Sequence, residues 1–443
     1  MNRRDVLRIL AGMTAVPRAA GAAAAQVWAA GVATVDITPE RPLWMAGFAR
    51  RSLPSQGVAL PLHAKALALR HGRGRPVVLV TADLLGVTAR ITDRVASAVR
   101  RLHGVERADI LFNASHTHCG PVVDEQLSVA YDLTPAQWDD IRAYTARLGD
   151  TLVTLVGQAL ANVKPARVGY GRGQASFAAN RRVAFTPDGP VDHDVPVLRV
   201  DGPGREPLAI VFGYACHNTT LQDTFVQYHG DYAGVAQSIL EVRHPGTTAL
   251  FVAGCGADAN PKPRGTIELV QAHGAALADA VERVLPATTS VTHAVRTAYD
   301  TVELPFARDE VRERWHKALD IDPVYLRRHA ALMAAAIARD GHLPASQADP
   351  VQVWTFGPDL TLVALGGEVV VDYAVRLARE LPGRRLWVAG YSNDVFGYVP
   401  SRRVLREGGY EGGDAMIYYG RPGPFTDDVE EIIVRECRRL MGR

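Results

Sequence analysis

The stretch DILFNASHTHCGP, residues 109–121, joins a short apolar run to a pair of histidines. Residues 109–113 have the length and composition of a strand that is covered on both faces. The run ends just before His116 and His118, and α/β sheets place their functional sites at the carboxyl ends of strands. Side chains two residues apart on an extended chain point the same way, so the sequence predicts that both imidazoles face one site.

Three uses of this histidine pair fit the sequence. Both imidazoles can bind a metal ion, for which zinc is a common partner. Alternatively, one can bind the metal while the other moves protons. The third interpretation is a pair of surface histidines at a turn.

Outward from this stretch, apolar runs alternate with helical patterns along most of the chain. Such alternation predicts an α/β fold of mixed β-sheets flanked by helices. We expect further strands at residues 33–38, 64–70, 76–81, 208–212, 248–253, 361–365 and 385–389. We expect helices at residues 91–102, 135–163, 232–242, 267–284, 309–319, 323–340, 370–381 and 427–441.

The chain is predicted to form one large domain over residues 27–443, because Pro/Gly/Ser linkers are short throughout. Residues 309–340 are rich in Ala, Arg and Leu with helical spacing. They are predicted to form a helical insertion that covers part of a sheet.

A second histidine, His217 in GYACHNTT (residues 213–220), also follows an apolar run. It is either a buried core histidine or a metal ligand, and metal ligands gathered from different strand ends would make a rigid site. Asp231 stands just before a predicted helix, where it can act as the N-cap or can orient a ligand histidine.

Three further motifs follow predicted strands. The loop GCGADANP, residues 254–261, is either a plain turn or a loop whose N–H groups stabilise an oxyanion. Glu368, after Gly366-Gly367, is either a helix cap or a ligand, and the tyrosines of residues 391–400 are either packing or site residues.

The N-terminus, residues 1–25, resembles a twin-arginine export signal. It combines Arg3-Arg4 with a short apolar stretch and a run of small residues. An amphipathic N-terminal helix is the alternative. We expect a periplasmic or secreted protein, and no other stretch is apolar enough to predict a membrane span.

Charge and cysteine content narrow the function classes. The 443 residues carry a net charge of +2 with no long basic run, which argues against a nucleic-acid partner. The four cysteines form no CxxC pair and no zinc-knuckle spacing, and they are interpreted as small buried side chains. An exported protein could pair them in disulfides, but the sequence selects no pairing.

Taken in order, the motifs resemble the neutral (alkaline, non-lysosomal) ceramidase family. The resemblance spans most of residues 30–425. The matching pieces are VDITP (35–39), SHTHCG (115–120), His217, Asp258, Gly367-Glu368, Gly397-Tyr398, Tyr410-Glu411 and IYYG (417–420).

The resemblance implies the catalytic-domain fold of that family and a single zinc ion in a deep pocket. Carried over by position, the zinc ligands are His116, His217, Glu368 and Tyr398, and the catalytic set is His118, Arg181, Asp258 and Asn260. The family hydrolyses the N-acyl bond of ceramide to a fatty acid and sphingosine. Zinc chemistry of this kind polarises the carbonyl and lowers the pKa of a bound water towards ~7.

Two departures from the family bear on the substrate. Asn260 stands where the family has a serine, so a zinc-bound water is the expected nucleophile, while the amide can still donate to an oxyanion. The sequence stops at residue 443, so we expect no C-terminal immunoglobulin-like domain of the kind that the family carries.

The sequence therefore predicts an exported, zinc-dependent hydrolase of an N-acyl bond, with a ceramide-like lipid favoured by the resemblance. Two alternatives stay open. One is a related zinc hydrolase of a non-lipid, polar substrate such as an ester or a glycan derivative. The other is a non-catalytic periplasmic binding protein. The oligomeric state is not predicted.

Overall fold

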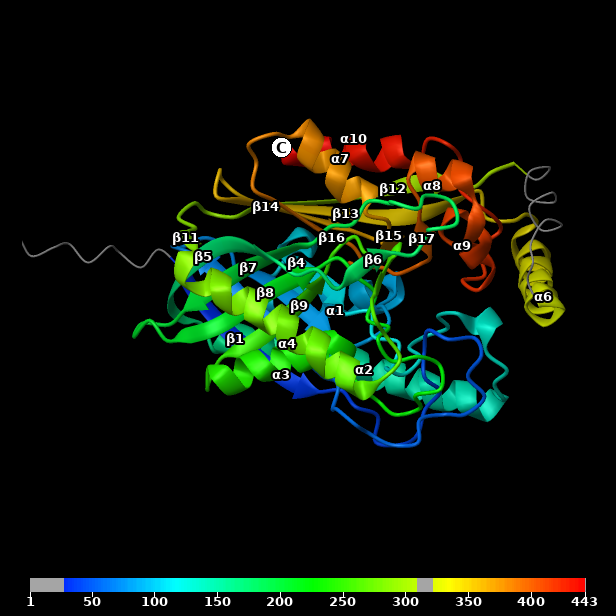
Figure 1. The fold of residues 1–443 in the computed structure, drawn as a ribbon, viewed down its shortest axis with the longest axis horizontal. Helices are drawn as coiled ribbons and strands as arrows, with labels where there is room; N and C mark the ends of the chain where they lie inside the picture. Colours follow the sequence, from blue (N-terminus) through cyan, green and yellow to red (C-terminus); the bar gives the residue numbers. More distant parts are fainter. Residues whose placement is uncertain (1–27, 309–321, 443) are drawn as a thin grey trace, which may run out of the picture.

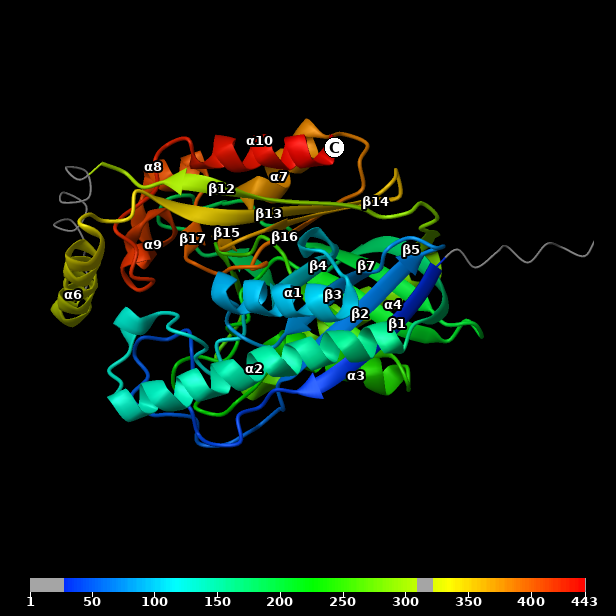
Figure 2. The same cartoon turned by 180° about the vertical axis from the view of Figure 1, so that it is seen from behind.

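Residues 28–308 and 322–442 are described by the computed structural model. They form four layers, in which two β-sheets pack face to face and helices cover the outer face of each (Figure 1 and Figure 2). The site lies at one end of this sandwich, where several strands end.

The first sheet has nine strands. It is mixed, because β3 pairs with β4 and β8 with β9 in parallel, whereas the other neighbours are antiparallel. The order is β4 (Ile110–Ala114), β3 (Val77–Ala82), β2 (His63–His71), β1 (Trp28–Asp36), β5 (Lys164–Gln174), β7 (Asp194–Asp201), β8 (Pro207–Tyr214) and β9 (Thr248–Ala253), with β11 (Thr289–Ser290) beside β5.

Helices cover the outer face of this sheet in two pairs. Helices α1 (Ala89–His103) and α2 (Pro135–Ala161) pack on the β1–β4 half, and α3 (Asp231–Arg243) and α4 (Ile267–Val284) pack on the other half. The start of α2 is fixed by a capping box, because Thr134 accepts from the backbone N–H of Gln137 and the Gln137 side chain accepts from Thr134 N–H.

The second sheet consists of β12 (Arg296–Pro305), β13 (Ser346–Phe356), β14 (Leu360–Leu365) and β16 (Leu386–Ala389), in that order. Its inner face meets the first sheet in an aromatic-rich core that includes Trp354, Phe356 and Trp387. Helices α7 (Asp372–Glu380) and α10 (Val429–Met441) cover its outer face.

Strand β3 shows why a strand that is covered on both faces has a nearly continuous apolar sequence. Val77 and Leu79 pack between the two sheets, whereas Val78 and Val80 pack under α1 and α2. Because successive side chains point to opposite faces, a strand covered on both sides has few positions for polar side chains.

Shorter elements complete the end that carries the site. They are β6 (Ala178–Asn180) paired with β10 (Ala259–Pro261), β15 (Glu368–Val369) paired with β17 (Tyr398–Val399), α6 (Pro323–Asp340), α8 (Arg402–Glu407), α9 (Gly409–Gly412) and the 3-10 turns Ser128–Ala130 and Asp414–Ile417. Two further 3-10 turns, Arg107–Asp109 and Leu285–Ala287, lie elsewhere.

The predicted fold class is confirmed, and each strand and helix predicted within the described residues is present. The main displacement is in β1, which begins at Trp28 rather than at residue 33. Four long strands were not predicted: β5, β7, β12 and β13. The predicted helix 309–319 and the export signal 1–25 lie outside the described residues.

Helix α6 matches the predicted helix 323–340, but the prediction that this insertion covers a sheet is wrong for α6. It lies beside the 3-10 turns Ser128–Ala130 and Asp414–Ile417 and buries only His329 and Ala336. Its alanine-rich surface offers too little apolar area to cover a sheet.

All four cysteines are buried, as predicted, and none forms a disulfide, a point that the sequence had left open. In the described part of the chain, no helix combines the length and the apolar character needed to cross a membrane.

Candidate metal centre and active site

The site is assembled from segments that leave the carboxyl ends of β4, β8, β9, β14 and β16. Asn113, at the end of β4, joins three of them: its Oδ1 accepts from Ala253 N–H of β9 at 2.8 Å, and its Nδ2 donates to the Gly390 carbonyl after β16 at 2.8 Å. A backbone bridge between Thr117 and Asn218 sets the two histidine loops side by side. The framework of the site is therefore built largely from backbone contacts.

His116 and His217 are oriented by backbone carbonyls. The Nδ1 atom of His116 lies 2.7 Å from Leu85 O, and Nδ1 of His217 lies 2.9 Å from Gly256 O. A carbonyl oxygen only accepts, so Nδ1 carries the hydrogen in each ring and Nε2 keeps its lone pair. This is the arrangement that metal-binding histidines adopt.

Glu368 and Tyr398 are neighbours in a two-residue parallel ladder. They are direct Cα partners in the pairing of β15 with β17, so their side chains leave the ladder together. The Tyr398 hydroxyl lies 3.2 Å from His217 Nε2. Tyr419 donates its hydroxyl to Glu368 Oε1, which leaves Oε2 facing the histidines.

The contacts of Glu368 Oε2 test whether these residues fit a cation. This oxygen is buried, has no hydrogen-bond donor among the described residues, and lies 3.0 Å from His116 Nε2 and 3.2 Å from His217 Nε2. Three acceptor atoms with no hydrogen between them repel one another, and a buried polar atom without a partner is costly. A metal ion at this position would remove the repulsion and would give the buried oxygen a partner. The residues present therefore fit a metal ion.

His118 lies at the same centre but is held differently. Its Nε2 lies 3.2 Å from His116 Nε2, and the ligand atoms of His116, His118 and His217 all lie within 4.8 Å of one another. The Nδ1 atom of His118 is buried without a partner in the described chain, so it lacks the orienting acceptor that the other two rings have. This contrast favours His116 and His217 as ligands.

Burial favours the neutral form of His217 and His118. Burial and, to a smaller extent, the nearby Arg181 guanidinium lower the pKa of His217 to about 4. Burial likewise holds the pKa of His118 well below its usual value, and His116 and His217 add to the effect. Neutral imidazole is the form that binds a metal or accepts a proton.

Arg181 reaches the centre from the loop after β6. Its Nη2 donates to the Tyr398 hydroxyl at 2.9 Å, and its Nη1 lies 3.4 Å from Asn260 Oδ1. Its Nε donates to Glu411 Oε1 at 2.6 Å, which fixes the plane of the guanidinium. Arg181 therefore presents a cation at the edge of the metal centre.

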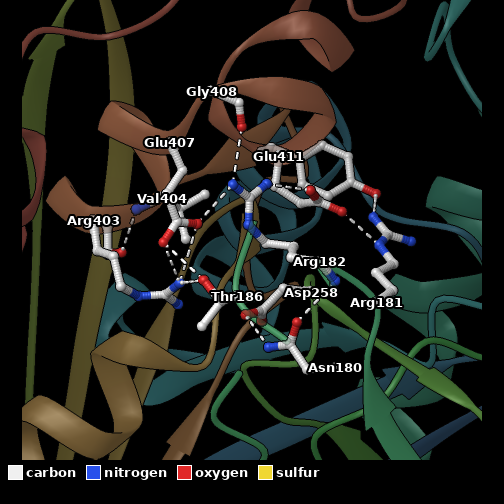
Figure 3. Close-up of polar contacts among 12 residues, drawn as sticks. Asn180, Arg181, Arg182, Thr186, Asp258, Arg403, Val404, Glu407, Gly408 and Glu411 are labelled. Atoms are coloured by element: carbon white, nitrogen blue, oxygen red, sulfur yellow. Dashed lines mark hydrogen bonds and ion pairs between the residues drawn. The ribbon is translucent and has the colours of Figure 1, made fainter. Parts of the chain in front are cut away.

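Glu411 ties Arg181 to a larger ionic network (Figure 3). Its second oxygen accepts from Arg182 Nη1 at 2.6 Å, and Arg182 also contacts Glu407 at 3.0 Å. Arg403 then pairs with Glu407, so cations and carboxylates alternate. The network joins α8 and α9 to the loop that carries Arg181.

Asn260 and Asp258 lie on the loop after β9 but face different ways. Asn260 Oδ1 is within reach of both Arg181 and the Thr219 hydroxyl, which leaves the Nδ2 hydrogens without a partner in the described residues. The Asp258 carboxylate accepts from Val371 N–H at 2.9 Å and from Asn180 Nδ2 at 3.1 Å. Asp258 therefore holds loops together.

The structure brings together all the predicted site residues except Asp258, which lies one contact away. One local expectation is corrected: the chain is not extended at His116, whose φ is 62°, because β4 ends at Ala114. The rings of His116 and His118 still meet, with centroids 4.8 Å apart. The catalytic and ligand roles of the individual residues stay predictions.

Sequence reasoning missed the roles of two residues that it had quoted in matching motifs. Tyr419 supports Glu368, and Glu411 supports Arg181. The only sequence signal for these roles was that both residues lie in the tyrosine-rich segment 410–420. Asp231 is not the N-cap of α3, and it does not orient a histidine of the site. Its carboxylate instead accepts hydrogen bonds from the backbone N–H groups of Leu221 and Tyr232.

Comparisons with known proteins place this chain in a family. The family described as neutral/alkaline non-lysosomal ceramidase, N-terminal, matches residues 28–261. Neutral ceramidases B and A of Dictyostelium discoideum are 24% and 23% identical to the chain over 262 and 259 residues. Each comparison covers 53% of this chain and 36% of the relative, so the match spans about a third of each relative's length.

Solved ceramidases share the fold. The crystal structure of neutral ceramidase from Pseudomonas aeruginosa superposes with a TM-score of 0.72 at 19% identity, over 93% of this chain and 75% of that one. A ceramidase complexed with C2 gives a TM-score of 0.72 at 17% identity, over 93% and 76%. The resemblance in the sequence motifs is confirmed: this chain belongs to the neutral/alkaline non-lysosomal ceramidase family.

Proposed function

We propose that this chain is a zinc-dependent hydrolase that cleaves an N-acyl amide bond. The observation that carries the proposal is Glu368 Oε2, which faces two imidazole lone pairs and has no donor in the described residues. Family membership favours a ceramide-like lipid as the acyl substrate.

His116, His217, Glu368 and Tyr398 would hold the zinc ion. When bound, zinc supplies Lewis acidity, which polarises an amide carbonyl and lowers the pKa of a water molecule towards ~7. The nitrogen and oxygen donors suit zinc, although tyrosine is an uncommon ligand.

The remaining side chains would bind the amide and move protons. Asn260 Nδ2 and the Arg181 guanidinium are donors for the carbonyl oxygen, whose negative charge grows in the transition state. His118, neutral and facing the centre through Nε2, would accept a proton from water and return it to the leaving amine. The products are a carboxylic acid and an amine.

The test is hydrolysis by protein that is stripped of metal and then reloaded with zinc. We expect reloaded wild type to cleave N-acyl substrates, and His217→Ala and Glu368→Ala to lose both metal and activity. His103→Ala, at an exposed histidine in α1, is the matched control and should behave as wild type.

Two outcomes would overturn the proposal. If the zinc-loaded protein cleaved esters or glycan derivatives and no amide, the substrate class would be wrong. If no substrate turned over with or without metal, a binding protein would become the better interpretation.

We also propose that the protein is exported, on the basis of Arg3-Arg4 and the small-residue run that follows. Fractionation of the native host should find the protein in the periplasm or medium. Arg3→Lys with Arg4→Lys should keep it inside the cell.

A further inference from the structure

A cavity of about 300 Å³ opens beside the proposed catalytic centre. Its walls include Phe48, whose ring lies 4.7 Å from that of His118, and Tyr410, whose ring lies 5.2 Å from that of Tyr398. A substrate with its amide at the centre would therefore extend through this cavity.

Both apolar and charged side chains line the cavity. Leu127, Ala130 and Tyr418 are among the apolar ones, and they suit contact with one acyl chain. Its volume lies at the low end of the range for small-molecule sites, roughly 300–1,000 Å³. An N-acyl compound with one long chain fits such a space more readily than a lipid with two.

The charged residues on the cavity wall carry an excess of positive charge. Arg50 and Arg264 both line the cavity, and neither has a carboxylate within ion-pair distance in the described residues. Asp223 is the one acidic residue on that wall. By contrast, Arg181 beside it is neutralised by Glu411.

Arg264 is also close to another cation. Although Arg264 is exposed overall, partial burial and repulsion from Arg181 together lower the pKa of its guanidinium. Arg50 and Arg264 outnumber Asp223 on the cavity wall, and this excess of positive charge makes a place where an anion is stabilised.

The loop that carries Arg264 is held at both ends. Lys262 N–H donates to Phe177 O at 2.8 Å, and Gly265 N–H donates to Thr220 O at 2.7 Å. The backbone is thus fixed on either side of Arg264, which reduces the conformational freedom lost when the side chain binds a ligand.

We propose that Arg264, assisted by Arg50, forms an anion subsite, and that the amine half of the substrate carries a carboxylate or phosphate near the amide. This inference rests on the proposed amide hydrolysis and names its substrate class: single-chain N-acylated amino acids or N-acylated phosphoamines. Water adds its hydroxyl to the acyl carbon and a hydrogen to nitrogen, the C–N bond breaks, and an anionic amine and a fatty acid are released.

The test compares matched substrates on the zinc-loaded full chain. N-dodecanoylglycine and N-dodecanoyl-phosphoethanolamine carry the anion, N-dodecanoylethanolamine lacks it, and N-dodecanoylethylenediamine reverses its sign. We expect wild type to prefer the two anionic substrates, with the favoured one identifying carboxylate or phosphate, and the preference to weaken as salt rises.

Variants then test which residues cause the preference for anionic substrates. Arg264→Gln should lower kcat/KM for the anionic substrates by about tenfold or more, with little change for the ethanolamide, because a charge-assisted hydrogen bond is lost. Arg264→Glu should shift the preference to the cationic substrate, and Asp223→Asn should strengthen the preference for anions. Arg73→Glu makes the same charge change at an exposed turn and should leave the ratio of kcat/KM values unchanged.

The outcomes separate the two proposals. If wild type cleaves the neutral amide or ceramide as well as the anionic amides, or if Arg264→Glu leaves the ratio unchanged, the anion subsite is refuted while amide hydrolysis stands. If none of the amides is cleaved, the proposed function itself fails. A ratio between two substrates does not respond to partial loss of folded protein, so a merely structural role for Arg264 would not change it.

Discussion

Replacing Glu411 by glutamine tests the ionic network that holds Arg181. Glu411 makes two contacts of 2.6 Å, to Arg181 Nε and Arg182 Nη1, and its side chain is only 6% exposed. Glu411→Gln keeps the volume but removes the charge, so two guanidinium groups then share one neutral acceptor. Breaking a buried ion pair in this way costs about 3–5 kcal/mol of unfolding free energy.

We expect the lower end of that range, about 3 kcal/mol, because Arg182 keeps two other acceptors. These are Glu407 Oε2 at 3.0 Å and the Gly408 carbonyl at 2.9 Å. Arg181 loses more, since Glu411 is its carboxylate partner. The same variant should therefore lower kcat/KM through misplacement of Arg181.

Glu431→Gln is the matched control. Glu431 also pairs with an arginine, Arg376, at 2.7 Å, but its side chain is 47% exposed. An exposed pair contributes about 1 kcal/mol or less, so this variant should be nearly neutral. The unfolding free energies are measured by urea titration followed by circular dichroism. The comparison requires that the dependence of the free energy on urea concentration is the same for all three proteins.

The pH dependence gives a second check on Glu411. Burial alone would raise the pKa of its carboxyl, but Arg181 and Arg182 outweigh burial and hold that pKa below its usual value. The carboxylate therefore stabilises the fold above the unfolded-state pKa of about 4.3. The difference between wild type and Glu411→Gln should be full at neutral pH and should shrink as the pH falls below that value. Equal, small losses in the two variants would refute the reasoning from burial.

Three further predictions concern the centre. Gly47→Ala would place a Cβ 2.3 Å from His118 Nδ1, so activity should fall while zinc content, measured by elemental mass spectrometry, is kept. Tyr419→Phe removes the hydroxyl that supports Glu368 and should weaken zinc binding by about 10–100-fold in chelator competition, with unaltered affinity contradicting the assignment. Asn260→Asp keeps the acceptor oxygen but loses the Nδ2 donor, so kcat should fall by about 10²–10³-fold; a fully active variant would exclude the donor role.

The strands most readily predicted from the sequence are those covered on both faces. The run Thr248–Ala253 is apolar throughout, and β9 has those bounds. Strand β12 was missed because it is an edge strand whose residues are mostly exposed or half-buried, so Arg296, Asp300 and Glu303 interrupt the apolar pattern. Strand β5 was missed for a related reason, since Gly169, Gly171 and Gly173 resemble a turn rather than a strand.

Only part of the site could be predicted from the sequence. Histidines at strand ends indicate a metal centre, but the left-handed backbone at His116 depends on contacts with residues far along the chain. The adjacency of Glu368 and Tyr398 comes from a two-residue ladder that is too short to give a periodic signal. The carbonyls that orient His116 and His217 belong to Leu85 and Gly256, and no side-chain pattern in the sequence marks them.

Metal content per chain, measured by elemental mass spectrometry on purified zinc-supplied protein, tests the central claim most directly. The three samples are wild type, His116→Ala with His217→Ala, and His118→Ala. We expect about one zinc per chain in wild type, none in the double variant, and most of the zinc kept in His118→Ala. Wild type without stoichiometric metal would contradict the metal centre, and loss of zinc in His118→Ala alone would reverse the assignment within the histidine pair.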